Sequence, residues 1–224
     1  FGASVANVVS RSVRDTALFL DAGHGHEPGS AYWAAPVERP YVEELRRDPG
    51  KLRIAVVRQS LTGAPLDPAI AATLEHTLKQ LLGLGHELEE LTLGIDPRQL
   101  FGAHGTVVGT GLLSLVHDRE QALGRAATAE DLEQITQVVL ERAKGTNGEA
   151  MYRARQSFES IGAAMEKHFE RFDLILSPVT ASLTPELGVL SLDQGWDSYA
   201  HKAMGSAGFT VLANVLSLIH ISEP

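Results

Sequence analysis

Residues 52–57, LRIAVV, are a short run of apolar and β-branched side chains, which predicts a buried strand. A helix signal follows at Asp67-Pro68, because aspartate suits the capping position of a helix and proline its first position. The apolar side chains that follow share one helical face: Ile70, Leu74, Leu78 and Leu81. Residues 86–91, HELEEL, then predict a second strand. A strand, a helix and a strand in this order build parallel sheets, so this stretch decides the fold.

The chain before this stretch holds two shorter helix signals. Ser12 followed by Asp15 resembles a capping box, and Gly23 is expected to end the helix that it opens. Residues 23–40 are rich in glycine, proline and alanine, which predicts a loop. Pro40 is then expected to begin a short helix.

The helix expected after Asp96-Pro97 is unusual for its glycines. These glycines are Gly102, Gly105, Gly109 and Gly111. Each one weakens a helix by about 1 kcal/mol relative to alanine. The pattern therefore predicts either close backbone packing or an unwound stretch beside a pocket.

The last third of the chain continues the alternation. Thr128 with Asp131 predicts another capped helix, and a long helix is expected between Gly145-Asn147 and about residue 172. Residues 173–178, DLILSP, predict a third strand that stops at a proline.

Beyond this strand the signals weaken. Residues 179–205 predict a loop, and residues 209–215 fit either a strand or the start of a helix. Strands that alternate with helices indicate an α/β layered fold.

Composition excludes several classes of partner. Nineteen basic and 28 acidic residues give a net charge of −9, without a cluster of Lys and Arg, so nucleic acid and anionic membranes are not expected as partners. No stretch approaches the roughly 18 consecutive apolar residues of a membrane span. Cysteine is absent, which excludes disulfides and fits a reducing compartment such as the cytoplasm.

Four segments resemble the amidase signature family, in the family's order. Residues 11–22, RSVRDTALFLDA, are similar to the helix that follows the family's catalytic core. The other segments are residues 32–41 with 52–55, residues 67–89, and residues 172–180 with Phe209-Thr210 and Asn214. Within the family, bacterial enzymes that act on small amides, including the cyclic-dimer hydrolases, are the most similar.

The resemblance implies a large mixed sheet flanked by helices and an amidase that works through a serine acyl-enzyme. The family's chemistry uses two serines and a lysine in a Gly- and Ser-rich core, and this chain has no such segment. The resemblance therefore implies no catalytic residue in this chain, because the core would lie upstream of Phe1. The resemblance implies that the parent protein uses neither a cofactor nor a metal and that its substrate is a small-molecule amide. It also allows a homodimer of the parent protein.

The end of the chain departs from the family pattern. Residues 1–215 are expected to be the C-terminal part of one amidase domain. Residues 216–224, LSLIHISEP, replace the family's Gly-Gln-Pro turn and resemble translated sequencing-adapter sequence. We expect this tail to be artefactual.

Two motifs resemble a metal-binding sequence and a nucleophile sequence, but for both we favour a structural interpretation. The sequence His24-Gly25-His26-Glu27 could hold a metal, yet a polar loop is the favoured interpretation because no other ligand motif lies nearby. Residues 205–208, GSAG, lack the first glycine of a nucleophile elbow and a positioned His-Asp pair.

Substrate contacts are predicted from the resemblance and from strand ends. They are Val107, Val108, Gly109 and Thr110 on the glycine-containing helix, and Thr180 after the third strand. The alternative interpretations are close helix packing for the four helix residues and a turn hydrogen bond for Thr180. A stand-alone, non-catalytic α/β binding module is the alternative function.

Overall fold

The computed structural model describes residues 8–26, 28–29 and 36–220 of the 224-residue chain. Residues 32–35 of the resemblance, Glu27 of the histidine motif and residues 221–224 of the tail lie outside the described residues. For residues 216–220 the backbone alone is described.

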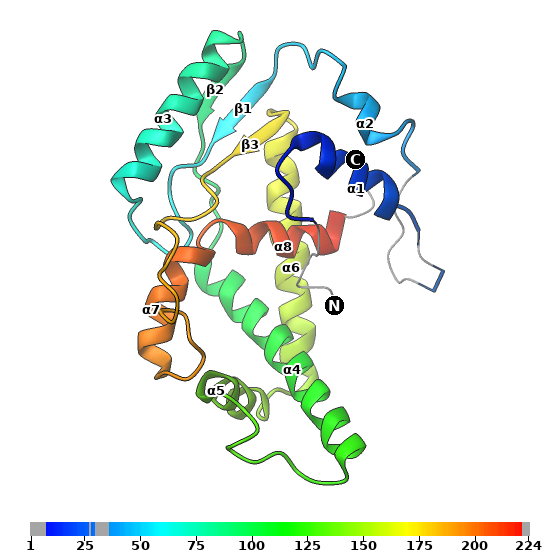
Figure 1. Cartoon of the computed structure of the whole chain (residues 1–224), viewed down its shortest axis with the longest axis vertical. Coiled ribbons are helices and arrows are strands. Elements are labelled where there is room, and N and C mark those ends of the chain that lie inside the picture. The colour runs from blue at the N-terminus through cyan, green and yellow to red at the C-terminus, as the bar shows by residue number, and fades with distance from the viewer. Residues whose placement is uncertain (1–7, 27, 30–35, 221–224) are drawn as a thin grey trace.

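Three parallel strands form the sheet at the centre of the upper part of the molecule (Figure 1). They are β1 (Arg53–Val56), β2 (Glu87–Glu90) and β3 (Leu174–Leu176), in the order β2-β1-β3. Ile54 pairs with Leu88 on one side and with Leu174 on the other. The predicted α/β class and the strand-helix-strand unit are confirmed.

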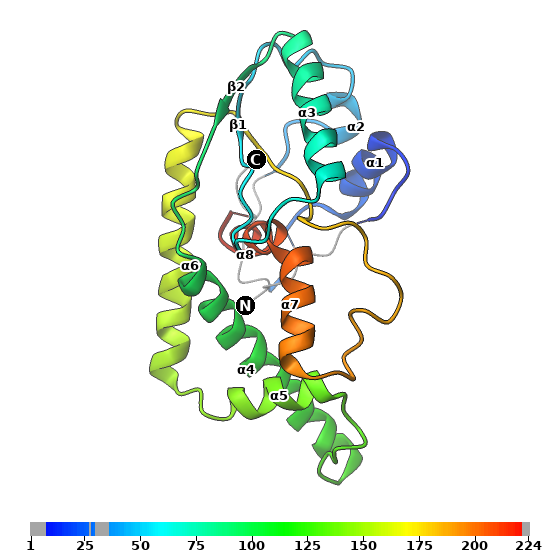
Figure 2. The ribbon, with the colours of Figure 1, turned by 90° about the vertical axis from the view of Figure 1, so that its left-hand side faces the viewer.

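Helices cover the two faces of this sheet unequally (Figure 2). Helix α3 (Pro68–Gly83) packs Leu74 and Leu78 against Val56, and Leu176 joins this cluster. On the opposite face, Ile175 packs against the core that α6 (Gly148–Phe169) and α8 (Thr210–His220) share. Alternate strand residues point to opposite faces, so Ile175 and Leu176 serve different layers.

The lower part of the molecule is helical. Helix α4 (Pro97–Leu123) runs beside α6 and contacts α5 (Gln134–Ala143), which in turn contacts α7 (Trp196–Ala207). By length and composition alone, α4 could cross a membrane. A mostly buried core helix of a soluble protein meets the same criterion, whereas 22% of the apolar window of α4 is buried, with Leu100 and Val107 packed in the core shared with α6.

Helices α1 (Val13–Gly23) and α2 (Tyr41–Glu44) form a small unit of their own. The Ser12 hydroxyl accepts a hydrogen bond from Asp15 N at 3.1 Å, as the sequence predicts. The Asp21 carboxylate accepts hydrogen bonds from the first backbone N–H groups of α2, at Tyr41 (2.5 Å) and Val42 (3.0 Å). Asp21 thereby satisfies donors at the start of α2 that the helix itself leaves unpaired.

Three sequence predictions are corrected. Thr128 and Asp131 hydrogen-bond to each other, but Asp131 also binds Arg125, and helix α5 begins only at Gln134. The expected loop 179–205 contains the start of α7, whereas of the two alternatives for residues 209–215 the start of a helix is confirmed, because α8 begins at Thr210. Helix α4 is continuous, so the unwound stretch is wrong, and Gly109 alone of its four glycines packs closely.

The start of β3 is tied to β1 by one carboxylate. Asp173 accepts hydrogen bonds from Arg53 at N (2.8 Å), Nε (3.3 Å) and Nη2 (2.9 Å). The Arg53 hydrogen bonds and charge hold the pKa of Asp173 below its ordinary value. Arg125 and Thr128 lower the pKa of Asp131 in the same way.

These lowered pKa values predict how stability depends on pH. A carboxylate whose pKa is lower in the folded than in the unfolded chain stabilises the fold above its unfolded pKa, about 4 for aspartate, and this stabilisation is lost as pH falls through the folded pKa. We expect the urea midpoint to fall between pH 6 and 3, and to fall less in Asp173→Asn. An unchanged pH dependence in that variant would contradict the assigned role of Asp173.

Candidate functional site

The loops that follow the three strands meet at one edge of the sheet. Because the strands are parallel, residues 57–63, 91–96 and 177–183 all leave from their carboxyl ends, where open α/β sheets bind ligands. Three of the clefts in the described part of the chain are lined by these loops. The β1–β2 cleft has a volume of about 470 Å³, the β1–β3 cleft about 170 Å³ and the α3–β3 cleft about 360 Å³.

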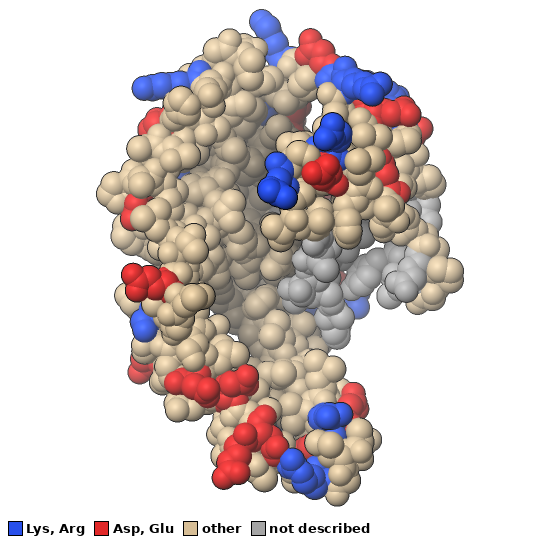
Figure 3. Space-filling view, in the orientation of Figure 1, with Lys and Arg blue, Asp and Glu red and all other residues tan. Residues whose placement is uncertain are grey.

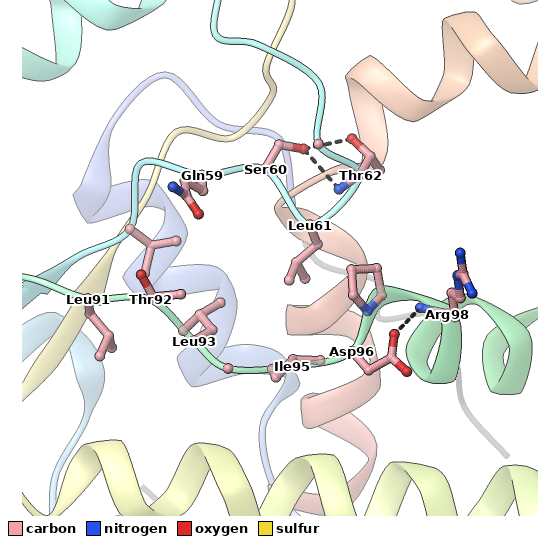
Figure 4. A pocket seen from close by; sticks show the side chains of 14 residues that line it. Gln59, Ser60, Leu61, Thr62, Leu91, Thr92, Leu93, Ile95, Asp96 and Arg98 are labelled. Atoms are coloured by element: carbon pink, nitrogen blue, oxygen red, sulfur yellow. Dashed lines mark hydrogen bonds between the residues drawn. The ribbon is translucent and has the colours of Figure 1, made fainter.

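The β1–β2 cleft lies between loop 59–62 and loop 91–96 (Figure 4). Leu61, Leu93 and Ile95 line its interior, and the exposed Gln59 and Arg98 belong to its polar lining. At the start of α4 the Asp96 carboxylate accepts a hydrogen bond from Arg98 N at 2.9 Å, which caps the helix. The cleft can hold a small polar molecule with an apolar part.

The serine of this cleft has a structural role. Ser60 is buried, and its hydroxyl shares a hydrogen bond of 2.7 Å with the Thr62 hydroxyl. The residues that line the cleft include neither histidine nor lysine. A serine nucleophile needs an adjacent base, and the described residues that line this cleft do not give Ser60 a histidine or lysine.

Thr180 lies in the α3–β3 cleft, at the end of the sheet where it was predicted to face a cleft. Its hydroxyl donates a hydrogen bond to Ser182 O at 2.8 Å. The lining comes from one side of α3 and from the segment after Leu176, and it contains no charged side chain: Ala69, Ile70, Thr73, Leu74, Thr77, Leu176, Ser177, Pro178, Val179, Thr180 and Leu183. Uncharged walls with hydroxyl groups suit a neutral, largely apolar ligand.

The other four predicted contact residues lie elsewhere, on α4, and line none of these three clefts. Val107 is buried in the core shared with α6, and a side chain at Gly109 would lie 3.3 Å from Cβ of Ala143. Val108 is exposed, and the Thr110 hydroxyl donates to Thr106 O at 2.7 Å. Their role as substrate contacts stays a prediction.

The two motifs given plainer interpretations lie in ordinary surroundings. The ring of His24 contacts that of Tyr41 edge to face, with centroids 5.6 Å apart. Gly205 and Ser206 belong to α7 and do not follow a strand. Within residues 8–26, 28–29 and 36–220, no group of three histidine, aspartate or glutamate side chains could hold a metal ion.

Sequence reasoning missed Gln59 and Arg98 as cleft residues. Their position in the sequence was the available signal, because Gln59 lies just beyond an expected strand and Arg98 lies at the start of a capped helix. It also missed a cleft of about 680 Å³ between loop 62–65, loop 181–189 and α7, where His201 and Lys202 line the wall.

Comparison with known proteins identifies the family. The sequence profile of the Amidase family matches residues 2–224. The chain belongs to the amidase signature family. The amidase match agrees with the observed layers, and it confirms the resemblance found in the sequence. The boundary predicted between residues 215 and 216 stays a prediction.

Two curated relatives of this chain are 6-aminohexanoate-cyclic-dimer hydrolases. The one from Paenarthrobacter ureafaciens is 28% identical over 232 residues, covering 100% of this chain and 47% of that protein. The one from Pseudomonas sp. (strain NK87) is 29% identical over 216 residues, covering 95% of this chain and 44% of that protein. The chain spans about half the length of these relatives.

Solved structures agree with this family assignment. A 6-aminohexanoate cyclic dimer hydrolase superposes with a TM-score of 0.82 at 28% identity, covering 92% of this chain and 45% of that chain. A bacterial aryl acylamidase of the amidase signature family has a TM-score of 0.72 at 18% identity, a likeness that shows the fold alone.

Proposed function

We propose that this chain is the substrate-binding flank of an amidase that hydrolyses non-peptide carboxamide bonds of a small molecule through a serine acyl-enzyme. The family match over residues 2–224 carries the proposal. The catalytic serines and lysine would lie upstream, in the half of the relatives' length that this chain does not span. Thr180 and the α4 residues Val107, Val108, Gly109 and Thr110 would contribute to the substrate pocket.

The described side chains support this division of labour. A lysine that acts as a base must be held neutral, and a serine must lie within its reach. Among the described residues, no serine hydroxyl is hydrogen-bonded to a lysine. Lys144 pairs with Glu141, and Lys202 Nζ donates to the side chain of Gln194.

A fusion tests the proposal. The upstream half of the P. ureafaciens hydrolase would be joined to the N-terminus of this chain. We expect hydrolysis of 6-aminohexanoate cyclic dimer or of simple amides by the fusion, measured as amine release, and none by this chain alone. Serine-dependent turnover by the chain alone would refute the upstream position of the catalytic groups. A folded but inactive fusion would count against the amidase proposal.

One observation favours a second candidate function, a non-catalytic binding module. In the part of the chain that the structure describes, two segments, 57–63 and 91–98, line the β1–β2 cleft together. The same assay separates the two functions, because a binding module gives no turnover in either form. For the parent protein we propose a cytoplasmic location and a homodimer as the assembly, with neither nucleic acid nor membrane as a partner, in line with the net charge of −9.

A further inference from the structure

The cleft of about 680 Å³ beside α7 has a lining unlike those of the three clefts above, and we call it the α7 cleft. It lies between residues 62–65, residues 181–189 and the last two turns of α7. Backbone hydrogen bonds tie these segments together, because Ala181 N donates to Gly205 O at 3.0 Å and Asp67 N donates to Ala181 O at 2.8 Å. The walls of the cleft are therefore fixed relative to one another.

The α7 cleft combines apolar, hydroxyl and basic side chains. Its apolar surface comes from alanine, proline, leucine and valine, and Thr62, Ser182 and Ser206 add hydroxyl groups. Of the described residues that line it, His201 and Lys202 are the ionisable ones, and no carboxylate is among them. A chain with a net charge of −9 thus lines this cleft with basic groups and no acid.

A neutral side chain holds Lys202 in place. Lys202 Nζ donates a hydrogen bond to Gln194 Oε1 at 3.2 Å, and Ser198 Oγ donates to the same oxygen at 3.0 Å. The Gln194 amide donates in turn to Val189 O at 2.9 Å and to Ser191 O at 2.7 Å. An ammonium group has three N–H donors, so Gln194 positions the Lys202 ammonium without neutralising it and leaves donors for a ligand.

Acidic side chains surround this basic wall. Glu186 lies in the loop of the cleft, Asp193 lies just before α7 and Asp197 in its first turn, and all three are exposed. Figure 3 shows acidic groups along the left margin, where α7 lies in Figure 1. Their repulsion grows with the charge of an anion, which disfavours a phosphate dianion or a polyanion. A ligand with a single negative charge, in direct contact with Lys202, suits this balance.

We propose that the α7 cleft binds a small organic acid, whose carboxylate contacts the Lys202 ammonium and whose uncharged body lies against the apolar walls. Hydrogen bonds between two charged groups are stronger than those between neutral ones, which favours a carboxylate over an amide here. Hydrolysis of a carboxamide releases such an acid, so under the proposed function the released acid is one ligand of this class. The site itself does not rest on that function, and an inactive fusion would leave it standing.

Hexanoate and hexanamide are matched probes for this site, because they share a carbon chain and hexanoate alone is charged near pH 7. Their binding to this chain would be titrated by saturation-transfer NMR. We expect hexanoate to bind about fivefold more tightly, as for an ion pair that stays exposed to solvent, and added salt to weaken hexanoate alone. Lys202→Gln is expected to abolish this preference. Lys167→Gln, at an exposed site on α6, is the control and should keep it.

Two variants of Gln194 test how Lys202 is positioned. Gln194→Glu and Gln194→Ala both lose the hydrogen bonds to Val189 O and Ser191 O, but the glutamate alone places a negative charge beside Lys202. We expect Gln194→Glu to remove the preference for hexanoate and Gln194→Ala to reduce it less. Circular dichroism spectra of all variants check that a lost preference does not come from unfolding.

The binding data decide between the outcomes. No binding of hexanoate, equal binding of hexanoate and hexanamide, or an unchanged preference in Lys202→Gln overturns the inference. Inorganic phosphate that displaces hexanoate at equal concentration overturns the assignment to a singly charged organic acid. A preference that is lost in Lys202→Gln and Gln194→Glu but kept in Lys167→Gln supports the site.

Discussion

Replacing Gly208 with alanine is expected to destabilise the fold by about 1–3 kcal/mol, the usual cost of an added methyl group in a packed site. A Cβ atom at position 208 would lie 1.9 Å from Oγ of Ser60 and 3.1 Å from its Cβ. Leu61 N donates a hydrogen bond to Gly208 O at 2.9 Å, which holds the two backbones together. Because Ser60 is buried, its loop has little room to yield. The urea midpoint of unfolding measures the effect.

Two further variants define the cause of this loss. Gly111→Ala on α4 has open space around the new methyl group, so the better helix propensity of alanine is expected to raise stability by up to about 1 kcal/mol. Adding Ser60→Gly to Gly208→Ala removes the Ser60 atoms from the contact and leaves Thr62 Oγ1 at 3.0 Å, so it should restore part of the loss. A Gly208→Ala variant as stable as the unaltered chain would show that the contact is absent.

Helix starts were predictable because their signals are local. Asp67 and Asp96 each accept a hydrogen bond from a backbone N–H two residues on, and Asn147 accepts one from Ala150 N. Each pairing depends on residues adjacent in sequence, so a short motif suffices to find it. The start of α7 has no such signal, since Gly195 precedes it without a side-chain cap.

The clefts and the close contacts depend on residues far apart in the chain. The contact between Ser60 and Gly208 joins two loops that no local pattern relates. Likewise, Thr180 faces α3 because β3 pairs with β1, whereas the α4 residues lie against α5 and α6. A single sequence predicts which residues follow a strand, but the tertiary packing decides which of these residues share a cleft.

Replacing Leu100 with alanine is expected to destabilise the fold by about 2–5 kcal/mol, as is usual when a buried leucine is truncated and leaves a cavity. Leu100 is fully buried in the first turn of α4, in a cluster with Phe158, Ile161 and Val215. These partners come from α6 and α8, so the cavity would open where three helices meet. Urea denaturation monitored by circular dichroism measures the loss.

Leu115→Ala on the same helix is the matched control. The substitution is identical, but Leu115 is 66% exposed, and exposed sites away from special features usually change stability by no more than about 0.5 kcal/mol. Leucine and alanine have similar helix propensities, so the difference in stability loss between the two variants reports the effect of burial. Equal losses at positions 100 and 115 would mean that α4 does not bury this face against α6. The packing that sets the base of the β1–β2 cleft would then need revision, because Leu61, Leu93 and Ile95 pack on the same cluster.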